Sequence, residues 1–223
     1  MCKGVNVKRC KCLFLRRAPG PHSKMHRRGH ELLLKPPIQL YGKTVYQQRN
    51  IGFFSDTSIG YYYSGQLAKA KRLNPHCAEL MGTINAQFGT KFNGILVNHY
   101  EDGNNYISDH SDDEKNLDPG GVIAISYGAE RKFRIRDKVT KSIVMDVPTT
   151  SNGLIHMGGD FQKEFTHGIP VEKKVQGARY SLTFRTHTVK PRLDGYFKVI
   201  LGECIPGLFK FFRLKRPHRT EAV

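Results

Sequence analysis

The chain has 223 residues, with 36 Lys and Arg against 19 Asp and Glu, a formal net charge of +17 and a hydrophobic content of 39%. That apolar content is enough for a folded core, which excludes a wholly disordered chain, and the five cysteines form no disulfide framework. The charge favours a nucleic-acid partner, although ribosomal proteins, heparin binders and membrane-surface proteins have a similar charge. We expect no secretory or membrane segment.

We predict one folded domain between two basic tails. Residues 1–37 are rich in Lys, Arg, His, Pro and Gly with little periodicity, which is typical of a mostly disordered arm. Residues 38–187 are expected to form the domain, with a first part at 38–65 and a core at 92–187. Residues 188–223 are expected to be a basic C-terminal tail.

Two features stand early in the domain. Gln39-Leu40-Tyr41-Gly42-Lys43 places glycine beside an aromatic residue, which on its own indicates an ordinary hairpin tip. A run of three tyrosines, Tyr61, Tyr62 and Tyr63, follows, and aromatic residues favour the half-buried surface of a strand. One alternative is therefore a strand whose tyrosines simply pack, and we expect Tyr62 to do only that.

The pattern of helices and strands predicts the fold class. We expect a helix from Asn74, which can cap it, through Pro75 at the first turn to about Phe88, and an earlier helix near residues 66–73. The later helix has an apolar stripe, Cys77, Leu80, Met81, Ile84 and Phe88. Strands are expected at residues 92–100, 122–127, 132–136, 142–147, 154–157 and 179–186. This order indicates an α+β fold, a double-stranded β-helix (jelly roll) with N-terminal helices packed on one sheet.

A His-x-Asp pair suggests a metal site. His110 and Asp112 lie two residues apart, so on an extended segment both side chains project from the same face. His167, which precedes a turn signalled by Gly168 and Pro170, could complete the set. Two imidazoles and one carboxylate leave one side of an octahedral Fe(II) open for other ligands. The alternative is that the pair is merely two polar surface residues.

The segment at residues 178–187 alternates strictly between apolar and polar side chains. Arg179, Ser181, Thr183 and Arg185 would share one face of a strand. Two guanidinium groups on one inward face suit a dicarboxylate, since arginine pairs with carboxylates in a planar fork. At about 3.3 Å per residue, however, the two Cα atoms are about 20 Å apart. A solvated basic strand face is the alternative.

A second basic strand is expected within Arg131-Lys132-Phe133-Arg134-Ile135-Arg136. The alternation puts Lys132, Arg134 and Arg136 on one face, which would suit a phosphate track.

Together these residues resemble the AlkB family of Fe(II)- and 2-oxoglutarate-dependent nucleic-acid dioxygenases over roughly residues 38–187. The resemblance implies that His110, Asp112 and His167 are the catalytic metal ligands. It also implies that 2-oxoglutarate is held by Asn98, Tyr100, Arg179, Thr183 and Arg185. Arg179 would pair with the distal carboxylate and Arg185 would lie nearer the metal. With oxygen as cosubstrate, such enzymes hydroxylate an N-alkyl group, and the product loses formaldehyde.

The early segment is similar to the duplex-DNA-repairing branch of the animal AlkB homologues. There Leu40 and Tyr41, with Gly42 and Lys43, would form a wedge that enters the base stack, and Arg49 would lie close to the strand left behind. An inserted apolar side chain offsets the cost of unstacking when a base is flipped out.

The same resemblance implies a lesion pocket. Tyr63 and His110 would sandwich the flipped base, Tyr61 would contact its edge or phosphate, and Asp113 would accept from an exocyclic amine. Tyr62 belongs to the same substrate-binding segment. Tyr63 stands where phenylalanine is expected. In addition, Met157-Gly158-Gly159-Asp160 and Phe184-Arg185-Thr186 look more like the single-strand relatives.

The predicted function is oxidative demethylation of 1-methyladenine and 3-methylcytosine, with etheno adducts as further candidates, in duplex DNA. A single-strand DNA or RNA demethylase of the same family, or a non-catalytic basic nucleic-acid-binding module, is the alternative. We expect a monomer, located in the nucleus if the source is eukaryotic and otherwise intracellular. Residues 205–212 resemble a sliding-clamp docking element, with a plain apolar tail as the alternative.

Overall fold

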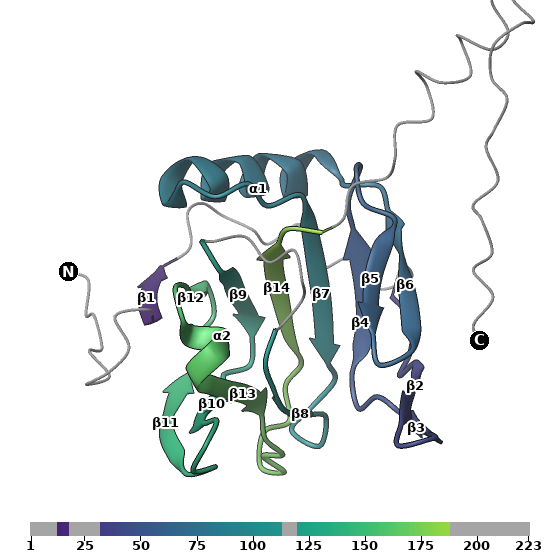
Figure 1. Cartoon of the computed structure of the whole chain (residues 1–223), viewed down its shortest axis with the longest axis vertical. Helices are drawn as coiled ribbons and strands as arrows, with labels where there is room; N and C mark the ends of the chain where they lie inside the picture. The colour runs from purple at the N-terminus through teal and green to yellow at the C-terminus, as the bar shows by residue number, and fades with distance from the viewer. Residues whose placement is uncertain (1–12, 18–31, 113–119, 188–223) are drawn as a thin grey trace, which may run out of the picture. The chain divides into compact units, whose positions relative to one another are not determined.

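The computed structural model describes residues 13–17, 32–112 and 120–187, so the predicted tail at 188–223 lies outside the described residues. Figure 1 shows a long helix lying across a large β-sheet, with a smaller sheet on the other side. In this described part of the chain, no helix has the length and apolar character needed to cross a membrane.

The larger sheet contains eight strands. In spatial order they are β1 (Leu13–Arg17), β12 (Gly153–Met157), β9 (Val122–Gly128), β14 (Arg179–Arg185), β7 (Gly94–Tyr100), β4 (Asn50–Phe54), β6 (Gln66–Lys71) and β5 (Gly60–Tyr63). All neighbours pair antiparallel except β4 and β6, which run parallel. The central strand β14 therefore lies between β9 and β7, where its side chains are covered on both faces.

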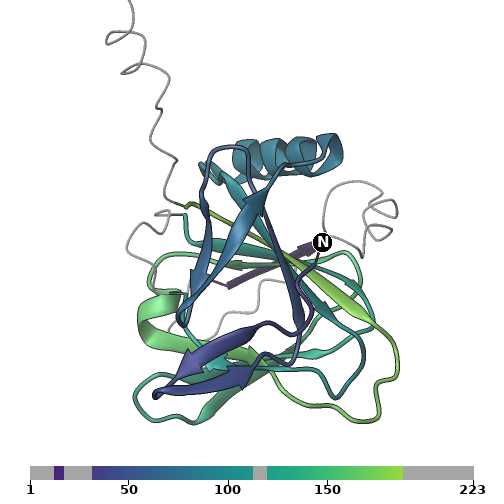
Figure 2. The ribbon, with the colours of Figure 1, turned by 90° about the vertical axis from the view of Figure 1, so that its right-hand side faces the viewer.

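The smaller sheet lies over one face of the larger one. Its four strands are, in spatial order, β11 (Ile143–Pro148), β10 (Lys132–Asp137), β13 (Phe165–Ile169) and β8 (Ile107–His110). Apolar side chains from both sheets meet in one cluster, which includes Val122 and Ala124 of β9 and Phe133 and Ile135 of β10. Figure 2 shows the two layers from the side. This mainly β architecture fits the predicted jelly-roll core.

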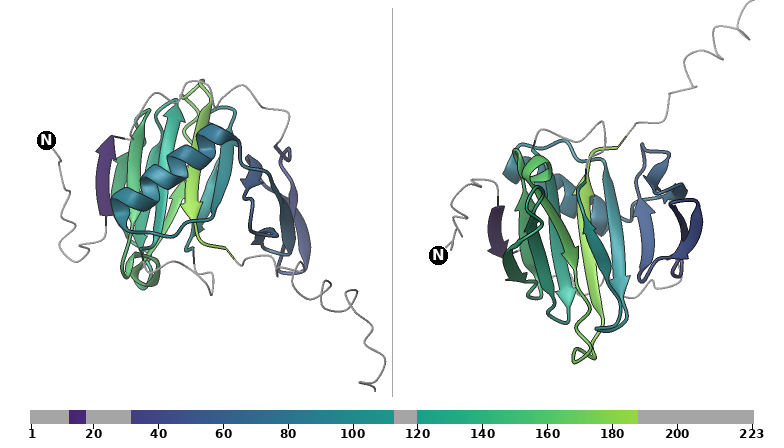
Figure 3. Two further views of the ribbon diagram at one scale, coloured as in Figure 1. Left: turned by 90° about the horizontal axis from the view of Figure 1, so that it is seen from above. Right: turned by 60° about the horizontal axis from the view of Figure 1, so that its bottom comes forward.

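Helix α1 (Pro75–Phe88) covers the opposite face of the larger sheet, as seen from above in Figure 3. It begins as predicted, because the Asn74 side chain accepts a hydrogen bond from the Cys77 backbone N–H at 2.8 Å and proline occupies the first turn. Leu80 and Ile84 are buried, and Phe88 packs partly buried against the same apolar cluster. The apolar stripe therefore faces the sheet, as the sequence predicts.

The predicted helix near residues 66–73 is wrong. Gln66–Lys71 forms strand β6, which pairs with β5 on one side and with β4 on the other. Ser64 and Gly65, with positive φ values of 44° and 81°, form the turn that folds β6 back on β5. Pairing with two strands outweighs the helix propensity of Gln, Leu, Ala and Lys. The fold therefore has one N-terminal helix on the sheet, and the other described helix, α2 (Phe161–Glu164), comes late in the chain.

One strand lies inside the arm expected at residues 1–37. β1 pairs antiparallel with β12, from Leu13 opposite Met157 to Arg17 opposite Gly153. The expected boundary of the arm at residue 37 stays a prediction. This segment reads Leu-Phe-Leu-Arg-Arg, and a short apolar stretch within a basic arm can pair with the exposed edge of a sheet.

A two-stranded hairpin projects from the domain. β2 (Pro37–Leu40) and β3 (Lys43–Tyr46) pair antiparallel, and Tyr41 and Gly42 form the two-residue turn. Both turn residues have positive φ, 50° for Tyr41 and 75° for Gly42. This backbone conformation occurs in tight two-residue hairpin turns, whose twist matches that of the two strands, and it favours glycine at both turn positions. A tyrosine in this conformation is strained, and its side chain is fully exposed at the tip, at 103%.

Candidate functional site

Strands β8 and β13 bring the three predicted metal ligands together. His110 ends β8, Asp112 follows it by two residues, and His167 lies in β13 directly opposite His110. One ligand atom from each residue lies within 4.8 Å of the others. Within the described residues this is the one group of such side chains close enough to hold a metal ion.

The protonation states suit metal binding. Burial, together with the neighbouring His110, lowers the pKa of His167 to about 3, and burial also lowers the pKa of His110. Both imidazoles are therefore neutral at pH 7 and keep a nitrogen lone pair. Because the Ser108 carbonyl can only accept, His110 Nδ1 donates the 2.9 Å hydrogen bond between them, which leaves Nε2 to face Asp112.

Two buried polar atoms at the triad have no hydrogen-bond partner. They are Oδ2 of Asp112 and Nδ1 of His167. Unsatisfied buried polar atoms are rare in folded proteins and call for an explanation, such as an ion. Two imidazoles and a carboxylate are the donor set that suits non-haem Fe(II), so these residues fit the metal that the sequence suggests.

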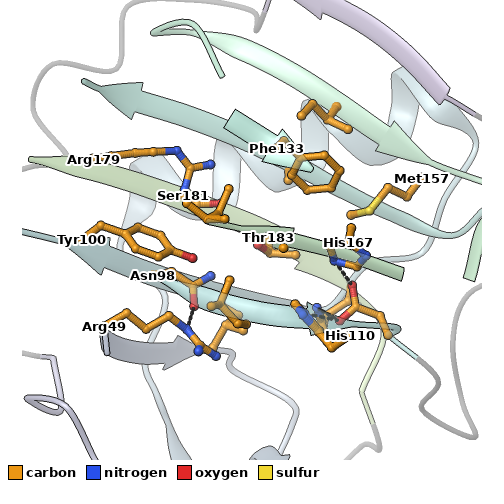
Figure 4. A pocket seen from close by; sticks show the side chains of 18 of the residues that line it. Arg49, Asn98, Tyr100, His110, Phe133, Met157, His167, Arg179, Ser181 and Thr183 are labelled. Atoms are coloured by element: carbon orange, nitrogen blue, oxygen red, sulfur yellow. Dashed lines mark hydrogen bonds and ion pairs between the residues drawn. The ribbon is translucent and has the colours of Figure 1, made fainter. Parts of the chain in front are cut away.

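The triad lies at one end of a pocket between the two sheets (Figure 4). β14 contributes Arg179, Ser181, Thr183 and Arg185 to the pocket lining. The residues that alternate with them along the strand point to the other face of the sheet. Leu182 and Phe184 belong to the apolar cluster beneath α1, and Tyr180 packs against it. The alternation therefore predicted correctly which side chains face inward, and the alternative of a solvated basic face is wrong because all four inward residues are buried.

Arg179 and Arg185 contact different groups. Arg185 Nη2 donates to Oδ1 of Asp112 at 2.8 Å, so this arginine lies at the triad. Arg179 donates from Nε to Thr149 Oγ1 at 3.1 Å and from Nη2 to Ser126 Oγ at 2.8 Å. Its carbon Cζ lies 5.2 Å from the Tyr100 ring centroid, and its Nη1 is buried without a hydrogen-bond partner. The separation of about 20 Å along the strand is thus no obstacle, because each arginine has its own place in the pocket.

Asn98 and Arg49 lie on the adjoining wall. Arg49 Nε donates to Asn98 Oδ1 at 2.8 Å, and Arg49 is only 3% exposed. Its guanidinium also lies 5.7 Å from the centroid of the Tyr63 ring. Arg49 is therefore part of the pocket wall, and its expected contact with the DNA strand left behind stays a prediction.

Of the three tyrosines in the run, Tyr61 lines the pocket and Tyr63 stacks beside it, with ring centroids 6.1 Å apart. Tyr61 is buried, and the Arg185 guanidinium lies 5.1 Å from its ring centroid. The ring of Tyr63 lies 6.4 Å from that of His110 with an angle of 76° between the planes. Parallel rings about 7 Å apart are needed to enclose a base at ordinary contact distances. In this conformation Tyr63 and His110 meet edge to face, so they do not yet form the expected sandwich.

Other expected contact residues are exposed. Tyr62 is 66% exposed, so the expectation that it simply packs on a half-buried strand surface is wrong, because its side chain lies on the outer face of β5. Leu40 is 38% exposed and Lys43 is exposed beside it on the hairpin. Asp113 and the predicted clamp element at 205–212 lie outside the described residues.

The second basic strand is largely neutralised. Arg134 pairs with Asp146 through two hydrogen bonds of 2.8 Å, and Arg136 pairs with Asp109 at 2.6 Å. Lys132, Arg134 and Arg136 alternate with buried Phe133 and Ile135, as expected for one shared face. Because carboxylates already contact both arginines, this face is poorly suited to a phosphate track.

Three site residues were missed by the sequence analysis: Ser126, Thr149 and Gln162. Ser126 offered a signal, since it is a polar residue inside the buried apolar strand β9. Thr149 and Gln162 offered none, because Thr149 directly follows strand β11 and Gln162 lies in the short helix α2, where single polar residues are ordinary.

Comparison with known proteins identifies relatives. A family model described as the 2OG-Fe(II) oxygenase superfamily matches residues 15–185. The human protein named DNA oxidative demethylase ALKBH2 is 32% identical over 156 residues, which cover 66% of this chain and 60% of that protein. The Arabidopsis thaliana protein of the same name is 25% identical over 178 residues, 68% of this chain and 57% of that protein.

A Rattus norvegicus protein named alpha-ketoglutarate-dependent dioxygenase alkB homolog 3 is 33% identical over 132 residues. That match covers 53% of this chain and 45% of the rat protein. The chain thus spans less than two thirds of the length of these relatives. The family match contains the three candidate metal ligands and both arginines of β14, so the chain belongs to the 2OG-Fe(II) oxygenase superfamily, and its predicted resemblance to the AlkB family is confirmed.

Proposed function

We propose that this chain is a DNA-repair dioxygenase that removes N-alkyl groups from bases in duplex DNA, using Fe(II), oxygen and 2-oxoglutarate. The observation that carries the proposal is one pocket that combines the triad of His110, Asp112 and His167 with the buried Arg179, whose Nη1 has no partner. The relatives named DNA oxidative demethylase support DNA as the substrate.

In this proposal the triad holds the metal. His110 and His167 would donate neutral nitrogens, and Asp112 would donate the oxygen that has no hydrogen bond. Iron, 2-oxoglutarate and oxygen together supply the oxidant that hydroxylates the N-alkyl carbon, with release of succinate and carbon dioxide. The hydroxymethyl group then leaves the base nitrogen as formaldehyde, and the base is restored.

The cosubstrate would bind between β14 and β7. Ser126 and Thr149 occupy the Nε and Nη2 side of the Arg179 guanidinium, so its Nη1 end is the part available to the distal carboxylate. Tyr100 lies beside this guanidinium, and Asn98 and Thr183 complete the lining toward the metal. Arg185 would keep the Asp112 carboxylate oriented while the substrate is bound.

The hairpin of β2 and β3 would act as the wedge on duplex DNA. An exposed aromatic side chain at a tight turn can replace a flipped base in the stack. We propose that Tyr63 rotates about its side-chain bonds to lie parallel to His110, with the base between them. Tyr61 would contact the base edge, and Asp113 remains the proposed acceptor for its exocyclic amine.

Single-strand DNA or RNA is the second candidate substrate. The segments Met157–Asp160 and Phe184–Thr186, which resemble the single-strand relatives, favour it. A non-catalytic module is disfavoured by the two unpartnered polar atoms at the triad. A monomeric state, location in the nucleus of a eukaryotic cell and clamp docking through 205–212 remain proposals. A peptide of residues 203–216 that fails to bind a sliding clamp would remove the last of these.

The test is a repair assay with defined oligonucleotides. The protein is loaded with Fe(II) without oxygen, then exposed to air with ascorbate and 2-oxoglutarate, and duplex and single-stranded substrates with one 1-methyladenine are followed by mass spectrometry. Loss of one methylene mass that requires both oxygen and 2-oxoglutarate supports the proposal, and the faster substrate decides between duplex and single strand. No loss on any alkylated oligonucleotide by metal-loaded protein would overturn DNA repair.

A further inference from the structure

Gln162 is a buried polar residue that the proposed chemistry does not use. It lies in α2, five residues before His167, and is 7% exposed. Its Oε1 accepts a hydrogen bond from the backbone N–H of Asp112 at 2.9 Å. The bond joins two segments that are 50 residues apart in the chain.

The orientation of the Gln162 amide follows from its partners. A backbone N–H can only donate, so the atom that faces Asp112 must be the amide oxygen. The amide nitrogen then points to Met157 Sδ at 3.7 Å, a weak acceptor. Lys138 Nζ donates to the Gln162 backbone carbonyl at 3.2 Å and holds the short helix in place.

The surroundings of Gln162 would suit an apolar side chain. Its neighbours Met157, Phe161 and Phe165 belong to the apolar cluster between the sheets. A buried amide in such a place costs free energy unless it is hydrogen-bonded. Packing alone therefore does not explain a glutamine here, whereas the bond to Asp112 does.

This bond fixes the part of the triad that strand pairing does not hold. His110 and His167 are register partners of β8 and β13, but Asp112 lies beyond the end of β8. Ser111 Oγ donates to the Phe165 carbonyl at 3.0 Å, and Gln162 holds the next residue. These two side-chain bonds tie the His110–Asp112 segment to the chain that leads into His167.

We propose that Gln162 is a positioning residue for the metal site, which sets the backbone direction of Asp112 and so aims its carboxylate at the ion. The inference rests on the proposed metal role of the triad. Partners that orient metal ligands typically change metal affinity by 10- to 100-fold when they are removed, so the same range is expected here.

The test measures metal binding without turnover. Gln162→Met keeps the length and apolar packing but removes the acceptor, whereas Gln162→Glu keeps an oxygen at the same position. Lys163→Met, on the same helix with its side chain 82% exposed, is the matched control. Full-length proteins are titrated with Co(II) alone, followed by its visible absorption, and the Tm of each metal-free variant is measured.

The expected result is Co(II) binding about tenfold or more weaker in Gln162→Met, with substantial recovery in Gln162→Glu and no change in Lys163→Met. Equal Co(II) affinity of wild type and Gln162→Met would overturn the positioning role while leaving the metal site intact. Loss of affinity together with a lowered Tm in both Gln162 variants would overturn it in favour of a structural role. If the wild type binds no Co(II), the proposed metal site itself fails, and the inference fails with it.

Discussion

The guanidinium of Arg185 donates from Nη2 to Oδ1 of Asp112 at 2.8 Å, and both residues are buried. Burial by itself raises the pKa of the Asp112 carboxyl, but the neighbouring guanidinium of Arg185, with smaller contributions from His167 and His110, outweighs it and holds the pKa well below its usual range. The carboxylate is therefore ionised throughout the neutral range. One of its oxygens is held by the arginine, and the other has no hydrogen-bond partner.

Asp112→Ala should abolish metal-dependent turnover and weaken Co(II) binding by at least about tenfold, because two histidines remain and Fe(II) binds poorly to such a pair. The control is Asp109→Ala, since Asp109 pairs with Arg136 and takes no part in the triad. Titration with Co(II) and the repair assay measure both effects. Full activity of Asp112→Ala would contradict the proposed ligand set.

Arg179→Lys should raise the KM for 2-oxoglutarate by about tenfold or more, because loss of a charge-assisted bond costs about 1.5–3 kcal/mol. The lysine keeps the charge but cannot bond Ser126 and Thr149 while also presenting a planar end to a carboxylate. Arg134→Lys, on the surface pair with Asp146, is the matched control. Steady-state kinetics with varied 2-oxoglutarate provide the measurement, and an unchanged KM would count against Arg179 as the carboxylate partner.

Replacing Leu40 and Tyr41 by alanine should reduce repair of duplex DNA by about tenfold or more while sparing single strands, because unstacking a base costs a few kcal/mol that the wedge offsets. Val139→Ala provides the control, since Val139 is 88% exposed in the turn after β10. Initial rates on matched duplex and single-stranded oligonucleotides measure the effect. Equal loss on both substrates would exclude the wedge role.

Stability of the metal-free protein should fall on acidification. Burial, with Arg185 nearby, lowers the pKa of His187 to about 3, against 6.5 for an ordinary histidine. Between these two pKa values the unfolded chain binds a proton that the folded chain does not. The free energy of unfolding therefore falls by up to about 1.4 kcal/mol per pH unit as the pH falls below about 6.5. His187→Phe keeps the aromatic contact with Phe53 and should reduce this slope. Urea denaturation from about pH 7.5 to about 5 measures it, and identical slopes would contradict burial of a neutral His187.

Much of the site could be predicted because its residues lie on regular elements. The alternation of residues 179–185 indicated the inward face of β14, and the spacing of His110 and Asp112 indicated that these two candidate ligands lie close together. In each case, because side chains alternate between the two faces of an extended segment, the position of a residue in the sequence determines the face to which its side chain points. The capped start of α1 at Asn74 was predictable for a similar reason, since one side chain and one proline define it.

The errors occurred where distant pairing decides the structure. The segment Gln66–Lys71 is made of helix-forming residues, yet β4 and β5 bind it from both sides as a strand. The buried position of Arg49 was not predictable either, because its bond to Asn98 lies across 49 residues of sequence. The supporting bonds of Ser126, Thr149 and Gln162 likewise join segments that no local pattern relates.

At position 41, the residue that would best stabilise the turn differs from the aromatic residue that the proposed wedge needs. The φ of 50° at Tyr41 is a conformation that glycine and asparagine adopt more easily than tyrosine, by roughly 1–2 kcal/mol for a left-handed residue. Selection of a random library for heat resistance alone would therefore replace this tyrosine early. If the proposed wedge role is correct, the most stable members of such a library would be among its poorest at opening a double helix, and this residue should be held fixed in any stabilisation of the protein.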